Sequence, residues 1–284
     1  MNETTRSLRV ATWLGWQIES NWTEPFLFIG YSVLKPIASA LILVFMYFVI
    51  TQGNFSSPLF AYMYVGNAFF IYVGSVLLGV SSTIVEDREH YGMLKYIYVS
   101  PIQVYFYLLG RGMAKTITAT IAVGITLGFG VIALGVHLDI SAIDWLLLIT
   151  VLFLGLAGLG FMGILLAGIL LITARHNDIV AEAVAGALYL LCGAVFPISV
   201  MPDFLQTLGR AIPITYWLEA LRRALLGTET VQHLQTGLEH FSTATILLIL
   251  AGSTLAAIGL SIGVYRWCER RAKEKGLIDM QTMY

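Results

Sequence analysis

The side chains that could do chemistry gather in one stretch, residues 86–101. It opens with the densest charge cluster of the chain, Glu-Asp-Arg-Glu at 86–89, and continues with Met, Leu and three tyrosines. No charge occurs between Leu59 and Val85, and the chain turns apolar again after the stretch. A charged hinge between two apolar runs predicts a loop at a membrane face. Its mixture of charges and large apolar side chains predicts binding, in which a partner grips the loop, rather than catalysis.

Residues suited to catalysis or metal binding are dispersed along the chain. The five histidines are far apart, and the HExxH, P-loop and GxSxG patterns do not occur. Cys192, within an apolar run, and Cys268, after the last one, predict neither a disulfide nor a metal site. Glu182 is the one carboxylate within a predicted span, whereas an ion pump needs carboxylates at mid-membrane. The chain therefore shows no energy source of its own, and uphill transport would need a partner that supplies energy.

The rest of the composition is that of an integral membrane protein. Hydrophobic residues make up 58% of the 284 residues and charged residues 12%, with a mean hydropathy of +0.81, whereas soluble domains carry about 25% charged residues. Apolar runs of membrane length recur, and only helices or closed barrels satisfy the backbone in lipid. The alternation typical of barrel strands does not occur. The net charge of −1 predicts no nucleic-acid partner, and the first residues lack the pattern of a cleaved signal peptide.

These runs predict an all-α integral membrane fold with one domain, residues 1–284, and six transmembrane helices. The predicted spans are 26–50, 58–85, 102–135, 145–172, 179–199 and 242–265. Residues 1–25 mix tryptophans with charges, which predicts a helix in the membrane interface. Residues 200–230 are interrupted by prolines and predict two short re-entrant helices on the outer face.

Lysine and arginine give the predicted orientation. Six spans put both ends of the domain on one side of the membrane, and of the 16 lysines and arginines only Arg210, Arg222 and Arg223 fall on the other side. Basic residues concentrate in cytosolic segments. Both termini and the 86–101 stretch are therefore predicted to be cytosolic.

Several residues within or beside the spans have two interpretations. Lys35, a third of the way along the first span, either snorkels to the near interface or faces a polar cavity. Arg222 and Arg223 either anchor to lipid headgroups or attract an anionic substrate. Gly124 and Gly128, four residues apart, predict close helix packing. Aromatic residues of the second span either face lipid or form a wall of a substrate path. These aromatic residues are Tyr62, Tyr64, Phe69, Phe70 and Tyr72.

Two stretches resemble signature segments of ABC-2-type transporter permeases. Residues 86–101 share an acidic–arginine–glutamate segment, a glycine, an apolar pair and a terminal Ser-Pro. Residues 193–227 contain the corresponding Phe-Pro, second X-Pro, third proline, arginine and glycine. The chain departs from the family pattern at Lys95, where glutamate is usual, and at Met201, where leucine is commoner. The chain length and the six predicted spans also agree, so the resemblance covers essentially the whole chain.

The resemblance implies a permease subunit of an ATP-driven exporter in the plasma (inner) membrane, which is not an enzyme by itself. Two permeases, expected to form a homodimer, would enclose the path. Two cytosolic ABC ATPase subunits would bind ATP and magnesium, leaving this chain without a cofactor or metal. Residues 86–101 would be the coupling helix, seated in a groove of the ATPase.

The resemblance also implies roles for particular residues. The residues expected to contact the ATPase are Glu86, Asp87, Arg88, Glu89, Met93, Leu94, Lys95, Tyr96 and Ile97. The expected outer gate comprises Phe196, Pro197, Pro202, Pro213 and Arg222. The candidate path residues are the five aromatic residues named above together with Lys35.

The expected substrate is amphipathic, lipid-like or a lipid-linked glycan. The 193–227 stretch resembles the drug- and nodulation-factor branch of the family, which favours an amphipathic or lipid-like substrate. Two other functions stay open. A passive channel or structural membrane subunit would work without nucleotide. A membrane-embedded enzyme that processes lipids or glycans would need a cluster of polar side chains facing a shared cavity.

Overall fold

The computed structural model describes residues 3–20, 25–52, 55, 57–136, 138–173 and 177–278, and this part of the chain is helical throughout, without strands. The longer helices are α1 (Glu3–Ser20), α2 (Pro25–Thr51), α3 (Pro58–Tyr72), α6 (Val104–Leu134), α7 (Trp145–Ile172), α8 (Asn177–Leu191), α10 (Pro213–Leu226) and α12 (Thr243–Glu274). The shorter ones are α4 (Gly79–Val85), α5 (Leu94–Val99), α9 (Asp203–Ala211) and α11 (Thr228–Gln232), with π-helical segments η1 (Val73–Leu78) and η2 (Glu86–His90) and a 3-10 turn η3 (Ile198–Val200).

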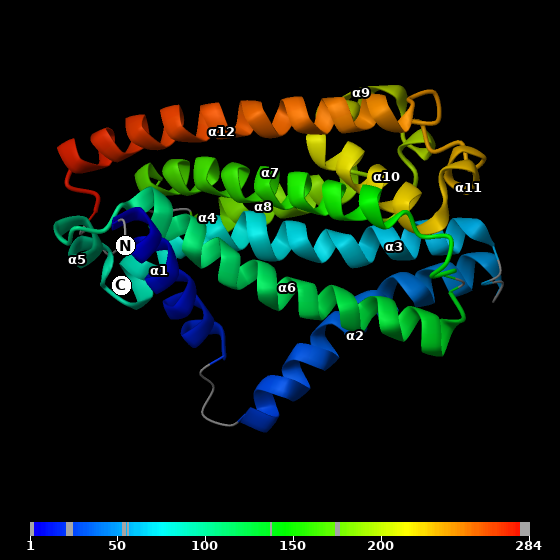
Figure 1. The fold of residues 1–284 in the computed structure, drawn as a ribbon, viewed down its shortest axis with the longest axis horizontal. Helices are drawn as coiled ribbons and strands as arrows, with labels where there is room; N and C mark the ends of the chain where they lie inside the picture. The colour runs from blue at the N-terminus through cyan, green and yellow to red at the C-terminus, as the bar shows by residue number, and fades with distance from the viewer. Residues whose placement is uncertain are drawn as a thin grey trace.

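Figure 1 shows the long helices packed lengthwise into one bundle, with α12 lying along α7 and α1 lying along the first half of α6. The helices α1 and α5 and the last turns of α12 gather at one end, and α9 and α11 lie at the other end. Residues 1, 2 and 21–24 of the predicted interfacial helix fall outside the described part. The all-α membrane fold predicted from the sequence is confirmed.

Five described helices are long and apolar enough to cross a membrane, one fewer than predicted. They are Gly30–Thr51, Pro58–His90, Val104–Leu134, Trp145–Ile172 and Thr243–Glu274. The predicted span 179–199 corresponds to α8, which ends at Leu191. Its 15 residues would extend about 22 Å, less than the roughly 30 Å hydrocarbon core. The helix stops there because Gly193 takes a left-handed backbone conformation, with φ at +67°, and Pro197 follows.

The second predicted span ends later than expected. α3, η1, α4 and η2 form one continuous helix from Pro58 to His90, so the charged residues at 86–89 extend a helix and do not form a loop. The chain turns only at Gly92, where φ is +58°. The backbone N–H of Met93 then donates to the Asp87 carbonyl at 2.8 Å. The separate helix α5 is therefore shorter than the predicted coupling segment 86–101.

Residues 200–230, predicted to form two short re-entrant helices, contain the short helices α9 and α10 and the start of α11, and α10 is enclosed by the bundle. α10 packs on α3, α7 and α12, and nearly all its residues are buried. The Trp217 indole N–H donates to the Val151 carbonyl of α7 at 3.0 Å. Gly155 of α7 makes this possible, because a methyl group there would lie 1.9 Å from the indole nitrogen.

Close helix contact also positions α1. A methyl group on Gly110 of α6 would lie 2.6 Å from the Ala11 methyl and 2.7 Å from the Leu8 carbonyl oxygen. α1 and α6 can approach this closely only because that position lacks a side chain. Their contact brings the polar side chains of both helices together at the end of the bundle that carries α5.

Candidate functional site

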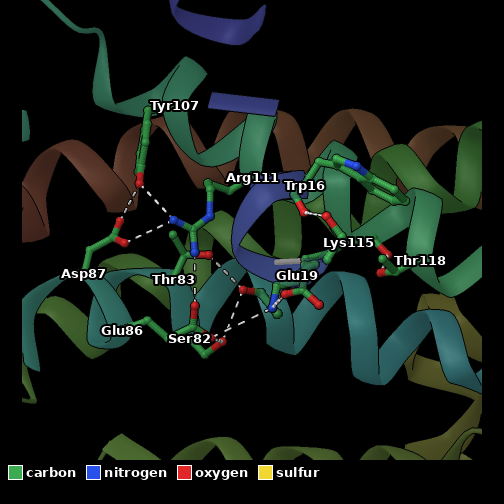
Figure 2. Close-up of polar contacts among 12 residues, drawn as sticks. Trp16, Glu19, Ser82, Thr83, Glu86, Asp87, Tyr107, Arg111, Lys115 and Thr118 are labelled. Atoms are coloured by element: carbon green, nitrogen blue, oxygen red, sulfur yellow. Dashed lines mark hydrogen bonds and ion pairs between the residues drawn. The ribbon is translucent and has the colours of Figure 1, made fainter. Parts of the chain in front are cut away.

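Six polar residues from three elements meet beside α5, and we call them the Arg111 network (Figure 2). Its members are Glu19 of α1, Glu86 and Asp87 of η2, and Tyr107, Arg111 and Lys115 of α6. Tyr107, Arg111 and Lys115 are four residues apart, so one face of α6 supplies all three side chains. The network therefore ties the end of the Pro58–His90 helix to α6 and α1.

The centre of the Arg111 network is a buried ion pair. Asp87 and Arg111 are 0% and 1% exposed, and their closest oxygen and nitrogen atoms are 3.2 Å apart. The Tyr107 hydroxyl donates to the second Asp87 oxygen at 2.8 Å and accepts from Arg111 at 3.1 Å. Burying a charge is costly unless partners satisfy it. Arg111 and Tyr107 together supply the partners that Asp87 needs.

The edge of the network is partly open to solvent. Glu86 accepts from Arg111 at 3.1 Å and from the Ser82 hydroxyl at 3.2 Å. Lys115 forms an ion pair with Glu19 and lies 3.9 Å from Glu86. Lys115 therefore bridges a carboxylate of α1 and one of η2 across the surface of α6, as Figure 2 shows.

Arg88, expected to contact a partner ATPase, is instead buried within the chain. Its guanidinium donates to Glu89 at 2.9 Å and to the Leu171 carbonyl at the end of α7 at 3.3 Å. The latter bond satisfies one of the carbonyls left open at a helix C-terminus. Arg88 thus attaches η2 to α7, and the prediction that it is available to a partner is wrong for this conformation.

The α5 helix divides its apolar side chains between an inner and an outer face. Leu94 and Ile97 are buried in a core cluster with α6, α7 and α12, and Met93 is partly buried against that cluster. These three residues, expected to contact the ATPase, are therefore covered partly or fully by the chain itself in this conformation. Tyr96 and Val99 are 66% and 88% exposed, and Lys95 is exposed beside them. With 3.6 residues per helical turn, Lys95, Tyr96 and Val99 lie on the face of α5 opposite Leu94 and Ile97.

Most of the aromatic residues expected along a substrate path lie inside the chain. The buried ones are Tyr62, Tyr64, Phe69 and Tyr72. The three tyrosine hydroxyls have internal acceptors, Glu219 at 3.0 Å, the Thr126 carbonyl at 2.6 Å and the Thr120 hydroxyl at 2.9 Å, respectively. Phe70 is half-buried. Lys35 is exposed, with its ammonium 5.1 Å from the centre of the Tyr31 ring. The residues expected along the path that keep open surface here are therefore Phe70 and Lys35.

A second buried charge cluster, which we call the Glu219 network, holds α10 at the opposite end. Its members are Tyr62, Glu219, Arg222, Arg223 and Thr236. Arg222 donates to the carbonyls of Tyr62, Gly193 and Ala194, at 2.9, 2.7 and 3.3 Å. Arg223 donates to the carbonyls of Phe241 and Leu238 at 2.8 and 2.9 Å.

Both interpretations of Arg222 and Arg223 are therefore wrong for this conformation. Neither guanidinium reaches lipid or an open path, because both are 1% exposed and directed at backbone carbonyls. Glu219 neutralises part of their charge through its bond to Arg223 at 3.3 Å. Of the other residues expected at an outer gate, Pro197 is buried, Phe196 and Pro213 are half-buried, and Pro202 is exposed.

The sequence-based interpretation missed Tyr107, Glu19 and Glu219 as members of these networks. The signal for Tyr107 was its position one turn before Arg111, which itself lies one turn before Lys115. Glu19 and Glu219 gave no local signal, because their partners come from distant segments. Within the described ranges, no three His, Cys, Asp or Glu side chains are grouped so as to hold a metal ion.

Apolar helices of membrane length, with charged side chains paired inside the protein at both ends of the bundle, define a multi-pass membrane protein. The chain belongs to the ABC-2 type transporter family, whose model matches residues 7–226, from within α1 to the end of α10. No curated protein matches the chain. Members of this family are membrane transport components that normally work with an ATPase subunit. The match confirms the family resemblance found in the sequence, and α11 and α12 lie beyond it.

Proposed function

We propose that this chain is the transmembrane permease subunit of an ATP-driven exporter. Two copies would form the path as a homodimer, and two cytosolic ABC ATPase subunits would bind ATP and magnesium. The substrate would be amphipathic, lipid-like or a lipid-linked glycan and would move outward. The observation that carries the proposal is α5, a short helix that exposes apolar side chains and is fastened to the bundle through buried contacts.

The exposed face of α5 suits a protein partner. Tyr96 and Val99 are exposed residues of α5. α5 lies at the end of the bundle that carries α1 and the α12 terminus (Figure 1), where the distribution of lysine and arginine predicts the cytosol. Large exposed apolar groups on a water-facing surface mark interaction sites. Lys95 adds a positive charge to this face. We therefore assign the coupling contact to Tyr96, Val99 and Lys95, and the anchoring of α5 to Leu94 and Ile97.

The Arg111 network suits transmission of a push on α5. α5 is joined to η2 by three residues, and η2 is tied to α6 by ion pairs and to α7 by Arg88. Lys115 of α6 extends the network to Glu19 of α1. A displacement of α5 would therefore be passed to several helix ends at once. At the opposite end, α9 and α10 would form the outer closure of the path.

A co-purification experiment tests this proposal. The tagged chain would be purified from membranes of cells that also make its ATPase subunit, and bound ATPase and ATP hydrolysis would be measured. We expect V99E to lower the co-purified ATPase by about tenfold or more, equivalent to about 1.4 kcal/mol of binding free energy. Val99 is almost fully exposed, so its replacement leaves the fold intact.

The matched control is I140E, which puts the same charge on an exposed isoleucine between α6 and α7, at the opposite end of the bundle. It should leave co-purification unchanged. Undiminished assembly of the V99E complex with full ATP-dependent transport would show that α5 is not the coupling contact.

A further inference from the structure

The helix α12 is longer than the membrane core is thick. Its 32 residues extend about 48 Å, compared with roughly 30 Å of hydrocarbon. Beyond it, Gly276 takes a φ of +65°, and the Leu277 N–H donates to the Ala272 carbonyl at 2.9 Å. This turn packs Leu277 and Ile278 against the same core cluster that holds Leu94 and Ile97 of α5.

Side chains of α12 hold α5 through one tyrosine. The Tyr98 hydroxyl of α5 lies 3.0 Å from the Tyr265 hydroxyl of α12, and the Lys273 ammonium lies 5.0 Å from the centre of the Tyr98 ring. Burial raises the pKa of Tyr98 above its usual range, so its hydroxyl stays protonated and able to donate. A second link joins α12 to the start of α6, where the Tyr105 and Ser261 hydroxyls are 2.9 Å apart.

The N-terminus of α12 lies beside the Glu219 network. Its N-cap, Ser242, follows the segment whose Leu238 and Phe241 carbonyls accept hydrogen bonds from Arg223 of α10. The Phe241 ring also meets Tyr216 of α10 edge-on, with centroids 6.1 Å apart. α12 thus contacts α5 at one end of the molecule and the α10 segment at the other (Figure 1).

The helix between these ends is suited to act as one rigid body. α12 contains no proline and is α-helical from Thr243 to Glu274, whereas α2 contains Pro36 and the Pro58–His90 helix contains two π-helical segments. Sharp helix kinks arise mainly at prolines, Gly/Ser pairs and π-bulges. α12 has one such pair, Gly252 and Ser253, but it has no proline or π-bulge, and its α-helix continues through the pair.

We propose that α12 is a rigid connector between the coupling helix and the outer α10 segment, with Tyr265 and Lys273 as positioning residues for α5. The proposal rests on the proposed coupling role of α5. A push on α5 would reach the outer closure through α12 as well as through the helices that flank α5 in the chain. The connector lies beyond the part of the chain that the family model matches.

The test places a reporter at the outer end. The H240C variant carries a cysteine at a position whose side chain is 89% exposed, just before α12. In the purified ATPase complex in vesicles, its reaction rate with a membrane-impermeant maleimide would be measured without nucleotide and with ATP plus vanadate. The native Cys192 and Cys268 are buried, and the unsubstituted complex gives their background rate.

We expect the labelling rate of H240C to differ between the two nucleotide states, and Y265F to reduce that difference by about twofold or more, the scale at which one member of a coupling network acts. ATPase co-purification should be unchanged by Y265F, since Tyr265 does not reach the exposed face of α5. K273Q, at a half-exposed position, should also reduce the nucleotide-dependent difference. It provides a second test of the proposal in case Y265F destabilises the chain. The matched control reporter, I140C, lies at the same end but is not attached to α12.

The outcomes separate the two proposals. The connector is overturned if the labelling rate of H240C still changes fully with nucleotide in both the Y265F and the K273Q backgrounds. It is also overturned if these substitutions reduce the nucleotide response of I140C as much as that of H240C. A wild-type complex that transports but shows no difference at H240C also overturns it, because the outer end of α12 would then be stationary. Failure of any ATPase to co-purify with the unsubstituted chain would instead remove the proposed function, and the connector with it.

Discussion

The Arg111 network (Figure 2) and the Glu219 network of α10 are both buried charge clusters. α5, beside the first network, and α10 lie toward opposite ends of the same bundle (Figure 1). The Pro58–His90 helix takes part in both, through Tyr62 near its start and through Glu86 and Asp87 near its end. The two clusters differ in the kind of partner that satisfies the charges. This difference suggests that one cluster serves the fold and the other serves motion.

In the Glu219 network, the partners are mainly backbone carbonyls. Arg222 and Arg223 together donate to five of them, and no fully buried side-chain polar atom of the cluster lacks a hydrogen-bond partner in the described part of the chain. A backbone carbonyl moves only with its segment. Such bonds therefore fix where α3, α8 and the 238–241 segment lie relative to α10.

In the Arg111 network, the partners are other side chains. Arg111 bonds to Glu86, Asp87 and Tyr107, and its Nε atom, like the Nη2 atom of Arg88, has no hydrogen-bond partner among the described residues. Side chains change partners by rotating, and an unsatisfied buried donor is costly to keep. We therefore expect substitutions at the Glu219 network to impair folding and those at the Arg111 network to impair coupling.

The largest effect on stability is expected from G66A. A methyl group on Gly66 would lie 1.7 Å from Arg222 Nη2 and 2.8 Å from the Ala194 carbonyl oxygen, so Arg222 must leave the carbonyls that it holds. Overpacking and a displaced buried charge together should lower the free energy of unfolding by about 3 kcal/mol. Chemical unfolding of the purified chain in detergent, followed by tryptophan fluorescence, measures this loss.

The matched control is G74A, on the same continuous helix, where the added methyl would meet no described atom within 4 Å. It should change the free energy of unfolding by no more than about 1 kcal/mol. Equal stability of G66A and G74A would show that Arg222 is free to move and that the Glu219 network is not a fixed structural cluster.

A smaller loss of stability, with a larger loss of activity, is expected from D87N. Asparagine keeps the shape of Asp87 but cannot accept from both Tyr107 and Arg111 through two oxygens. The free energy of unfolding should fall by about 1–3 kcal/mol, while transport by the folded complex falls further than the amount of folded protein does. Transport per ATP hydrolysed, measured in vesicles, distinguishes this outcome from simple misfolding.

The control for D87N is D139N, the same change at an exposed aspartate whose side chain accepts hydrogen bonds from the nearby Ser141. It should be neutral in both measurements. If D87N loses stability without any change in transport per ATP, the Arg111 network is as structural as the Glu219 network.

The helical class, most helix positions and the family could be predicted from the sequence, because hydropathy and the two signature stretches are local signals. The burial of the charged side chains could not be predicted from the sequence. Hydropathy ended the second span at Val85, yet the helix continues because Tyr107 and Arg111, distant in the sequence, satisfy Asp87. Arg222 was expected at the surface for the same reason, since its acceptors are carbonyls of two distant segments, at Tyr62 and at Gly193 and Ala194.

Small-residue spacing was also an incomplete guide to packing. Gly124 and Gly128 meet no described atom within 4 Å, so the predicted close packing does not occur within this part of the chain. Gly66 and Gly110, which have no glycine four residues away, are among the positions where a methyl group would collide. Which glycines are required depends on what lies opposite, and a single sequence does not contain that information.

The smallest effect is expected from E19Q, which removes the outermost charge of the Arg111 network. Glu19 and Lys115 are 26% and 16% exposed, and Lys115 keeps Glu86 as a second partner at 3.9 Å. Partly exposed pairs contribute about 1 kcal/mol or less. Thermal unfolding should therefore show a small loss of stability at low salt. This loss should shrink at about 1 M salt, because charges are then screened over about 3 Å.

E269Q provides the control for E19Q, because its partner Lys273 is more exposed, at 53%, and its loss should be smaller still. A loss for E19Q as large as that for D87N, unchanged by salt, would mean that the edge and the centre of the Arg111 network form one rigid unit. Side chains locked in this way could not exchange partners when α5 is displaced. The contrast between a network that fixes the fold and a network that transmits motion would then fail at the Arg111 end.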